Sequence, residues 1–320
     1  MTKTSLLLLG ASGFVGRSLL ARIHQMELSD LLFDKIYTLS RNPQNYLDAR
    51  ITPLLGDLSR EPIDCQPVGM IIHAATPASA DLNYSDPNAM FKLNVDAMAT
   101  VLDFASQQEA PPTVLFTSSG AVYASDSHHD LIGTNTRFID TSDFSSSAYA
   151  RGKIEAELML QEATLAGKCK GIIARLFAFS GTHLPRNRHF AIGNFVEDAV
   201  TLKKITVRSD GTSIRSYLDE RDMANWLLSI IDRGVPENIY HVGSERAISI
   251  GNLASLVSER YQLMTGDEIP VEILGQSSPL DGVMRYVPST FQTRKEMGLS
   301  ETISLENSID SMLQAAISQP

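Results

Sequence analysis

The sequence is poor in the residues that form covalent cross-links and metal centres. Its 320 residues include 2 cysteines, Cys65 and Cys169, and 7 histidines. The two cysteines lie far apart in the chain and have neither metal nor redox spacing, which excludes a disulfide framework and a thiolate metal site. The adjacent His128 and His129 have no carboxylate or cysteine at ligand spacing, so we expect a solvent-exposed loop there and no metal site.

Long hydrophobic runs are also missing. No apolar run reaches the roughly 18 residues that a membrane span requires. The N-terminal MTKTSLLLLG has one lysine and an apolar segment shorter than the core of a secretory signal, so we interpret it as a first strand. Because no export signal is visible, we expect a cytoplasmic protein with reduced thiols.

Basic residues are in deficit. The chain has 27 Lys and Arg against 37 Asp and Glu, and a formal net charge of −10. This charge argues against a nucleic-acid partner, although a local basic pocket that holds phosphates stays compatible with it. The length suggests one large domain or two closely joined domains.

Leucine-rich or β-branched runs alternate with amphipathic stretches over the first two thirds of the chain. We expect strands at 5–9, 35–40, 69–75, 113–119 and 171–177, and helices near 14–26, 94–108 and 147–166. This alternation predicts an α/β fold with a Rossmann-type, doubly wound parallel sheet, which binds ligands at the carboxyl ends of its strands. From about residue 180, shorter strands (204–209, 238–243, 270–275) mix with helices (221–233, 251–262), which predicts a smaller, interleaved lobe.

A glycine-rich segment follows the first expected strand. LLLLGASGFVGRSLL places Gly10, Gly13 and Gly16 at the start of a helix. The first glycine permits a tight turn, the second lets the backbone approach a pyrophosphate, and the third permits close packing of the helix on the strand. The N-terminus of a helix also favours negative charge. The segment predicts a dinucleotide site, whereas a plain strand–helix turn would need only one glycine.

We therefore expect a dinucleotide-binding domain at 1–178, with strand and helix contributions from about 210–243. We expect a substrate-binding lobe at 179–209 and 244–320.

SSAYARGKIE (146–155) places Tyr149 and Lys153 four residues apart in an expected helix. Residues with this spacing lie one above the other, so both would face the same ligand. A phenol has a reference pKa near ~10, and an adjacent ammonium with a positive nicotinamide would lower it by roughly 3 units. The alternative is an ordinary surface pair, unless a cofactor and a third polar group lie beside it.

These motifs, in this order, resemble the extended short-chain dehydrogenase/reductase family of the nucleotide-sugar epimerase/dehydratase type, over essentially the whole chain. The resemblance implies a catalytic set of Ser119, Tyr149 and Lys153, in which Ser119 is the hydroxyl four residues before Tyr123. Ser118 would point to the opposite side of the strand and is the weaker candidate.

The resemblance also implies the cofactor contacts. GDL (56–58) resembles the adenine contact, HAAT (73–76) the strand end beside the cofactor, and Asn94 the asparagine that starts the following helix. The expected cofactor-binding residues are Gly10, Ser12, Gly13, Phe14, Val15, Gly16, Arg41, Asp57, Leu58, Ala74, Ala75, Asn94, Tyr149, Lys153 and Phe177.

The end of the second expected strand bears on the choice of nicotinamide cofactor. KIYTLSRNP ends in Ser40 and Arg41, where sites that prefer NAD place an acidic residue. A guanidinium there would pair with a 2′-phosphate. We therefore favour NADP(H) and keep NAD(H) open, since Arg41 as a solvated loop charge is the alternative.

The substrate lobe resembles the family less closely. RLFAFSGTHLPRNRHF (175–190) resembles R-x-F-N-x-Y-G-P, but Ala178 and Ser180 replace the asparagine and the tyrosine. The resemblance implies that Arg215 clamps a diphosphate; Arg186, Arg188 and Arg285 are further basic candidates. The expected substrate-binding residues are Ser119, Tyr149, Asn194 and Arg215.

Gly120 and Ala121 stand where dehydratases of this family carry an acidic pair, so dehydration is disfavoured. We expect an NADP(H)-dependent reductase of a nucleoside-diphosphate 4-keto-6-deoxy sugar. The alternatives are an NAD-dependent epimerase with tightly bound cofactor, a non-catalytic NADP-binding sensor, and a reductase of a non-nucleotide carbonyl. The resemblance further implies a homodimer through the helices at 94–108 and 147–166.

Overall fold

The computed structural model describes residues 3–27, 33–41, 43–76, 80–124, 130–186, 190–276 and 283–318. His128, His129 and Arg188, three residues considered above, lie outside these ranges. The chain divides into two compact units. The first comprises Met1–Ala124, Arg137–Leu176 and Ala224–Tyr240, and the second comprises Ser125–Thr136, Phe177–Met223 and His241–Pro320.

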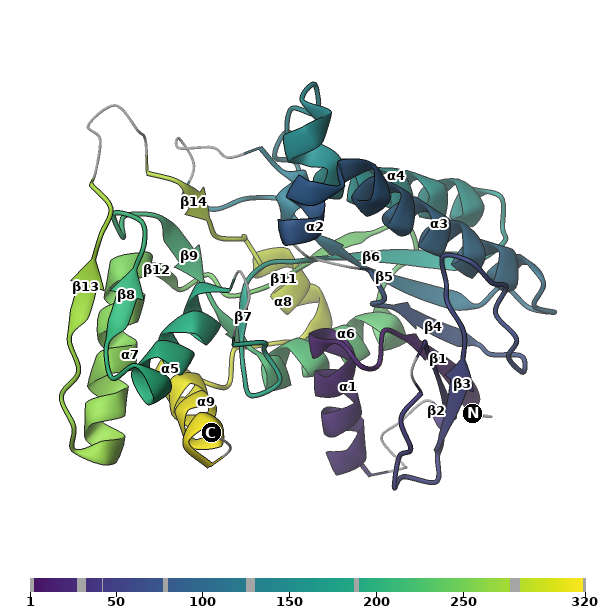
Figure 1. Cartoon of the computed structure of the whole chain (residues 1–320). Coiled ribbons are helices and arrows are strands. Elements are labelled where there is room, and N and C mark those ends of the chain that lie inside the picture. The colour runs from purple at the N-terminus through teal and green to yellow at the C-terminus, as the bar shows by residue number, and fades with distance from the viewer. Residues whose placement is uncertain are drawn as a thin grey trace. The chain divides into compact units, whose positions relative to one another are not determined.

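The first unit is built on a seven-stranded sheet (Figure 1). In spatial order its strands are β11 (Ile239–Val242), β6 (Lys170–Leu176), β5 (Thr113–Ser119), β4 (Met70–His73), β1 (Thr4–Leu9), β2 (Phe33–Ser40) and β3 (Ile51–Leu55). Neighbouring strands from β6 to β3 pair in parallel. The predicted α/β Rossmann-type fold is confirmed.

The strand order reverses between β1 and β4, and this reversal places the ligand-binding edge. The chain runs outward from β1 through β2 to β3, then returns to β4 on the other side of β1. Crossovers therefore leave on opposite faces at this point, and sheets of this kind bind ligands outside the carboxyl ends of the strands at such a reversal. The glycine loop follows β1 directly.

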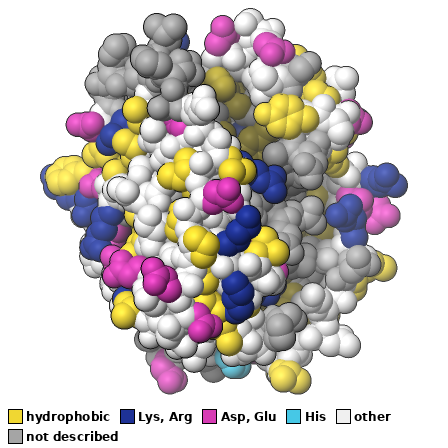
Figure 2. Space-filling model, turned by 60° about the vertical axis from the view of Figure 1, so that its left-hand side comes forward, with side chains coloured by type: hydrophobic (Ala, Val, Ile, Leu, Met, Phe, Trp, Pro, Cys, Tyr) yellow, Lys and Arg dark blue, Asp and Glu magenta, His cyan; other side chains and the backbone are white. Residues whose placement is uncertain are grey.

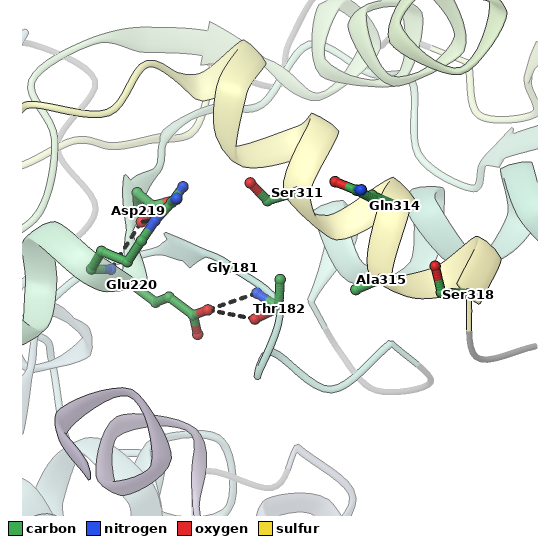
Figure 3. Close-up of a pocket in the computed structure, with 9 residues that line it drawn as sticks. Gly181, Thr182, Asp219, Glu220, Ser311, Gln314, Ala315 and Ser318 are labelled. Carbon is green, nitrogen blue, oxygen red and sulfur yellow. Dashed lines mark hydrogen bonds and ion pairs between the residues drawn. The ribbon is translucent and has the colours of Figure 1, made fainter. Parts of the chain in front are cut away.

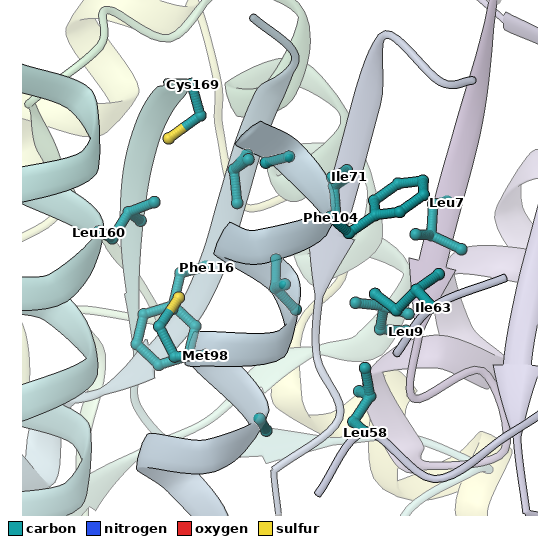
Figure 4. Close-up of a cluster of buried hydrophobic side chains, with 14 of the residues drawn as sticks. Leu7, Leu9, Leu58, Ile63, Ile71, Met98, Phe104, Phe116, Leu160 and Cys169 are labelled. Carbon is teal, nitrogen blue, oxygen red and sulfur yellow. The ribbon is translucent and has the colours of Figure 1, made fainter. Parts of the chain in front are cut away.

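Helices cover both faces of this sheet. Figure 1 shows α3 (Pro87–Ser106) and α4 (Phe144–Leu165) on one face, and α1 (Phe14–Gln25) and α6 (Glu220–Arg233) on the other. Side chains of β1 alternate between the faces, so Leu7 and Leu9 join the core beneath α3 and α4 (Figure 4). The drawn members of this core include Leu58, Ile63, Ile71, Met98, Phe104, Phe116, Leu160 and Cys169.

Helix α3 begins earlier than the expected 94. Asp86 accepts a hydrogen bond from the Ala89 amide at 2.9 Å, and Pro87 occupies the first turn, where its missing N–H costs nothing. Asn94 therefore lies inside α3 and is fully buried. The expectation that Asn94 starts this helix was wrong, because the cap lies upstream.

Strand β3 was not expected, since Pro53 interrupts its run of apolar residues. β3 lies at the edge of the sheet, where a residue without an N–H can be tolerated. The exposed side chain of Leu55 is consistent with an edge position.

The second unit is a smaller α+β body. Its helices α5 (Ala191–Thr201), α7 (Ile250–Thr265) and α9 (Leu305–Ser318) pack on one another. Its strands are β7 (Phe179–Ser180), β8 (Ile205–Val207), β9 (Ile214–Ser216), β10 (Leu218–Asp219), β12 (Ala247–Ser249), β13 (Val271–Ile273) and β14 (Arg285–Tyr286). The remaining short helices are α2 (Ala80–Ser85) and η2 (Gly120–Val122) in the first unit and α8 (Phe291–Met297) in the second.

Among the described residues, no helix is both long and apolar enough to cross a membrane. Both cysteines are free thiols, and burial raises the pKa of Cys65 to about 11. On the face drawn in Figure 2, basic and acidic side chains are interspersed.

Candidate active site

The glycine loop has the backbone geometry of a phosphate cradle. Gly10 has a φ of +87°, a conformation that side chains with a Cβ rarely adopt, and the Gly13 amide closes the turn on the Gly10 carbonyl at 3.0 Å. A Cβ on Gly10 would lie 2.4 Å from the Ala74 carbonyl oxygen, and one on Gly16 would lie 2.3 Å from the Gly10 carbonyl oxygen. Both contacts are impossible for real side chains, so the loop can take this form only with glycine at these positions.

The N-terminus of α1 is open toward this loop. Its N-cap, Gly13, makes no side-chain capping bond, and the first turn contains no acidic residue. Uncapped amides and the helix dipole together favour an anion. Ser12 and Gly13 are exposed, Phe14 and Val15 are partly buried, and Gly16 is buried against the loop. These residues fit the diphosphate of a dinucleotide.

The strand ends complete this edge of the sheet. The Ala74 amide donates to the Leu9 carbonyl at 3.0 Å, which joins the segment after β4 to the glycine loop. Ala74 and Ala75 are partly buried beside it. Their small side chains are compatible with close approach of a ligand.

Arg41 and Asp57 face each other beyond β2 and β3. Arg41 is exposed, and its charge is among the causes that lower the pKa of Asp57, after two hydrogen bonds from Ser59. The Ser59 amide and hydroxyl donate to Asp57 Oδ1 at 3.0 and 2.8 Å, while Leu58 is buried. A cation thus stands at the end of β2, where no carboxylate of that strand would repel a phosphate.

The fold brings the three expected catalytic residues together in the first unit. Ser119 ends β5, and Tyr149 and Lys153 lie one turn apart on α4. The Ser119 side chain lies near enough to the Tyr149 phenol to be among the influences on its pKa. Ser119 Oγ also accepts the Ala121 amide at 3.1 Å, which leaves its hydroxyl hydrogen to be donated. Two hydroxyl groups that lie this near each other can both donate a hydrogen bond to one carbonyl oxygen.

Lys153 is buried, and two hydrogen bonds hold its ammonium. Its ammonium donates to Thr76 Oγ1 at 2.5 Å and to the Thr117 carbonyl at 2.9 Å. Nζ lies 5.8 Å from the centre of the Tyr149 ring. Burial lowers the pKa of Lys153 to about 7, against the opposing effect of the Glu157 carboxylate. The charge of this side chain therefore changes near neutral pH.

The pKa of the Tyr149 phenol lies above its ordinary value. Burial raises its pKa, and the hydrogen bond with Ser119 only partly offsets this. The expected lowering of this pKa needs a bound nicotinamide as well as Lys153 and stays a prediction; in the protein without a cofactor, Lys153 does not offset the effect of burial. The physical reason is that Lys153 is itself partly discharged by burial, and its donors point to Thr76 and Thr117.

Two residues near the catalytic set were not recognised in the sequence. Thr76 accepts the Lys153 ammonium, and Asn83 of α2 accepts the Tyr149 amide at 2.9 Å through its side chain. Neither belongs to a motif that signals such a role. Thr76 is, however, part of the HAAT segment, and its hydroxyl so close to a strand end was a usable signal.

Behind this set lie buried polar atoms without partners among the described residues: both ring nitrogens of His73 and Oδ1 of Asn94. The Asn94 amide nitrogen donates to the Met90 carbonyl at 2.9 Å. The His73 ring stacks on Phe116, and burial lowers its pKa to about 3. His73 is thus held neutral inside the fold, and a cofactor contact for Asn94 stays a prediction.

The remaining expected residues belong to the second unit. Phe177 packs its ring against His241 and Tyr286, and Asn194 is partly buried on α5. Arg215 on β9 donates from Nη1 to the Ile214 carbonyl at 2.9 Å. Their roles toward cofactor and substrate stay predictions.

Two other basic candidates are engaged by carboxylates. Arg186 pairs with Glu197 at 3.3 Å, and Arg285 pairs with Asp130 at 3.5 Å. These pairs reduce the charge that either arginine could offer to a phosphate.

A polar pocket of about 350 Å³ lies in the second unit (Figure 3). Its lining comprises Gly181, Thr182, Asp219, Glu220, Arg221, Ser311, Gln314, Ala315 and Ser318. The buried Glu220 carboxylate accepts the Thr182 amide and hydroxyl, both at 2.8 Å, and approaches His183 Nδ1 at 2.9 Å. Arg221 is paired with Asp219 at 2.7 Å, so the charges of the pocket are largely neutralised internally.

Comparison with known proteins shows extensive similarity. Residues 6–243 match the model of the NAD dependent epimerase/dehydratase family. UDP-glucuronic acid decarboxylase 6 of Arabidopsis thaliana is 24% identical over 309 residues, which are 96% of this chain and 87% of that protein.

Two solved structures resemble the fold throughout. UDP-N-acetylglucosamine 4-epimerase from Methanobrevibacter ruminantium M1, in complex with UDP-N-acetylmuramic acid, superposes with a TM-score of 0.83 at 18% identity and full coverage of both chains. RMD from Pseudomonas aeruginosa, complexed with NADPH, superposes with a TM-score of 0.80 at 20% identity, covering 99% of this chain and 100% of that one.

Proposed function

Because the chain belongs to the NAD dependent epimerase/dehydratase family, we propose that it is an NADP(H)-dependent oxidoreductase that reduces the C4 ketone of a nucleoside-diphosphate 4-keto-6-deoxy sugar. The expectation of an NAD(P)-dependent enzyme of the extended short-chain dehydrogenase/reductase type is confirmed by this membership. The observation that carries the proposal is the convergence of three side chains: Ser119 at the end of β5 lies near the Tyr149 phenol, and Lys153 Nζ lies 5.8 Å from the centre of the Tyr149 ring.

The side chains divide the work at the carbonyl oxygen. Ser119 donates a hydrogen bond to that oxygen and stabilises the negative charge that develops on it. Tyr149, whose raised pKa keeps the phenol protonated at neutral pH, donates the proton. The nicotinamide, when bound, supplies the hydride. The diphosphate of the cofactor would be held by Gly10, Gly13 and Gly16, and its ribose by Lys153.

The residues around this set favour reduction over dehydration. Gly120 and Ala121 begin η2 directly after Ser119, so no acid or base stands there to remove a substrate proton and expel a hydroxyl. Arg41 at the end of β2 supports NADP(H) as the cofactor.

The proposal is tested by product and cofactor analysis. Purified protein is supplied with NADPH and a nucleoside-diphosphate 4-keto-6-deoxy hexose. We expect stoichiometric oxidation of NADPH and, from NADPH deuterated at nicotinamide C4, deuterium at C4 of the sugar. Absence of both would refute the reductase.

The same preparation distinguishes the alternative, an NAD-dependent epimerase, which the similarity to the Methanobrevibacter enzyme favours. Denaturation that releases stoichiometric NAD, together with interconversion of C4 epimers of a UDP-sugar, would establish it. Release of carbon dioxide from UDP-glucuronic acid would instead indicate the activity named for the Arabidopsis protein.

A homodimer through α3 and α4 is part of the proposal. Leu158 and Leu165 on α4 are 48% and 75% exposed, although both are large apolar side chains. Light scattering should give about twice the 35.0 kDa of one chain. Leu158→Glu should convert the dimer to monomer, and a wild-type monomer at micromolar concentration would contradict it. A cytoplasmic location stays a prediction.

A further inference from the structure

A buried charged network joins α4, β5 and β6 beside the catalytic set. Arg175 of β6 donates to both carboxylate oxygens of Glu157, from Nε at 3.0 Å and from Nη2 at 2.6 Å. Ser118 Oγ donates to the same carboxylate at 2.5 Å. The side chains of Arg175 and Glu157 are only 2% and 4% exposed. The network therefore lies wholly inside the first unit.

Burial of this ion pair is not explained by fold stability. The desolvation of two charges offsets most of their attraction, and apolar side chains of equal volume commonly serve as well. Arg175 nevertheless gains further partners: Nη1 donates to Tyr123 Oη at 2.5 Å, and the guanidinium lies 4.8 and 5.1 Å from the Tyr123 and Phe138 rings. The arrangement holds the Glu157 carboxylate in one place.

The position of Glu157 relates it to Lys153. The two residues are four apart on α4, so they lie on the same face of the helix. Lys153 donates to the carbonyl of Thr117, and Glu157 accepts from the next residue of β5, Ser118. Two successive turns of α4 thus contact two successive residues of β5, and Ser119 follows directly.

We propose that Glu157, anchored by Arg175 and Ser118, is a positioning residue for the reaction proposed above, and that it supplies the buried negative charge that keeps Lys153 protonated. The inference rests on the proposed function in one respect: the positive charge of Lys153 is taken to serve the reduction proposed above.

The charged and titratable groups around Lys153 support this role. They are His73 from β4, Tyr149 and Glu157 from α4, and, through Glu157, Arg175 from β6. Glu157 is the one carboxylate among these groups in the described part of the chain. Without it, both buried cations would lose the carboxylate that acts on them, and Lys153 is the one that can release its proton.

The direct test is the titration of Lys153 by NMR, with isotope-labelled lysine side chains and Lys153→Arg for assignment. In the wild-type protein without cofactor we expect a midpoint near the pKa of about 7 given above. Glu157→Gln, which keeps the shape and the acceptor for Ser118, should lower the midpoint by about one pH unit or more. Glu157→Asp keeps the negative charge, so its Lys153 midpoint should stay close to that of the wild type. An unchanged midpoint in Glu157→Gln overturns the proposal.

Asp310→Asn is the matched control, because it removes another arginine–carboxylate pair, between Arg260 of α7 and Asp310 of α9. It should leave the Lys153 midpoint where it is; an equal shift in this variant would overturn the proposal. If Glu157→Gln does not fold, Glu157→Leu combined with Arg175→Met removes both charges and tests the same midpoint.

Cofactor binding supplies a second measurement. Because Lys153 would lose its proton at lower pH, the affinity of Glu157→Gln for NADPH should begin to fall about one pH unit below that of the wild type. Identical profiles would contradict the role. Neither measurement uses a sugar substrate, so failure of the proposed reductase activity and failure of this inference are separate results.

Discussion

At the scale of single residues, Tyr149 and Lys153 show how burial moves the pKa of an acid and the pKa of a base in opposite directions. Burial disfavours the charged form of each group, which raises the pKa of the phenol and lowers that of the ammonium to about 7. In the reductive direction this suits the chemistry, because the protonated phenol is the acid that the carbonyl oxygen needs. Only the reverse, oxidative direction requires the phenolate.

Tyr149→Phe tests this assignment. It removes the proton donor and keeps the ring, so kcat should fall by about a hundredfold to ten-thousandfold. The dissociation constant for NADPH should stay close to that of the wild type, as measured by fluorescence titration. Undiminished turnover would remove Tyr149 from the mechanism.

Arg41 is the residue that we propose as the determinant of cofactor preference. Arg41→Ala removes a charge-assisted contact with the 2′-phosphate, worth about 1.5–3 kcal/mol, so KM for NADPH should rise roughly tenfold to a hundredfold. KM for NADH should hardly change, which makes NADH the internal control. An equal rise in KM for both cofactors would show that Arg41 does not contact the 2′-phosphate.

At the scale of elements, the contact between α3 and α4 depends on one glycine. A Cβ on Gly152 would lie 2.9 Å from Asn94 Cβ and 3.3 Å from the Phe91 carbonyl oxygen. Neither atom is the end of a flexible side chain, so α4 or α3 must shift to accept it. Gly152 therefore sets how closely the helix that carries Tyr149 and Lys153 approaches its neighbour.

Gly152→Ala should destabilise the protein by about 1–3 kcal/mol in urea unfolding, although alanine alone favours a helix by about 1 kcal/mol. Gly133→Ala is the control, because a Cβ there meets nothing within 4 Å. Stability equal to the wild type in Gly152→Ala would mean that separating the helices costs no more than the gain of about 1 kcal/mol in helix propensity.

Element boundaries were predictable where local signals exist. The strand at 113–119 agrees with β5 (Thr113–Ser119), since its β-branched and apolar run is bounded by Pro112 and Gly120. The predicted start of α3 was wrong, because Asp86 was not recognised as the N-cap of the helix. β3 was missed because Pro53 argues against a strand in the sequence. The strand forms because it lies at the edge of the sheet, where a proline is tolerated.

At the scale of the whole molecule, the buried His73 links the fold to pH. Its pKa is about 3 in the folded protein and ~6.5 in an unfolded chain, so between these values only the unfolded chain binds the proton. The resulting stability is complete above the unfolded pKa and is lost as the pH falls toward the folded one. The loss is on the order of 4 kcal/mol at the acid end.

Urea unfolding from about pH 7 down to about pH 4 measures this loss. His73→Phe should flatten the acid side of the curve, and the difference between the two proteins isolates His73 from the carboxylates that titrate in the same range. Parallel curves would show that His73 becomes charged without unfolding.

The sequence by itself determined the α/β fold, the glycine loop and the spacing of Tyr149 and Lys153. Each is a local pattern, in which backbone conformation or helical periodicity relates neighbouring residues directly. The tertiary structure alone decided that Thr76 and Asn83 contact Lys153 and Tyr149, that Glu157 pairs with Arg175, and that Asn94 is buried inside a helix. These contacts join residues from separate elements, so they depend on how strands order and helices pack, and burial then sets the charge of the groups brought together.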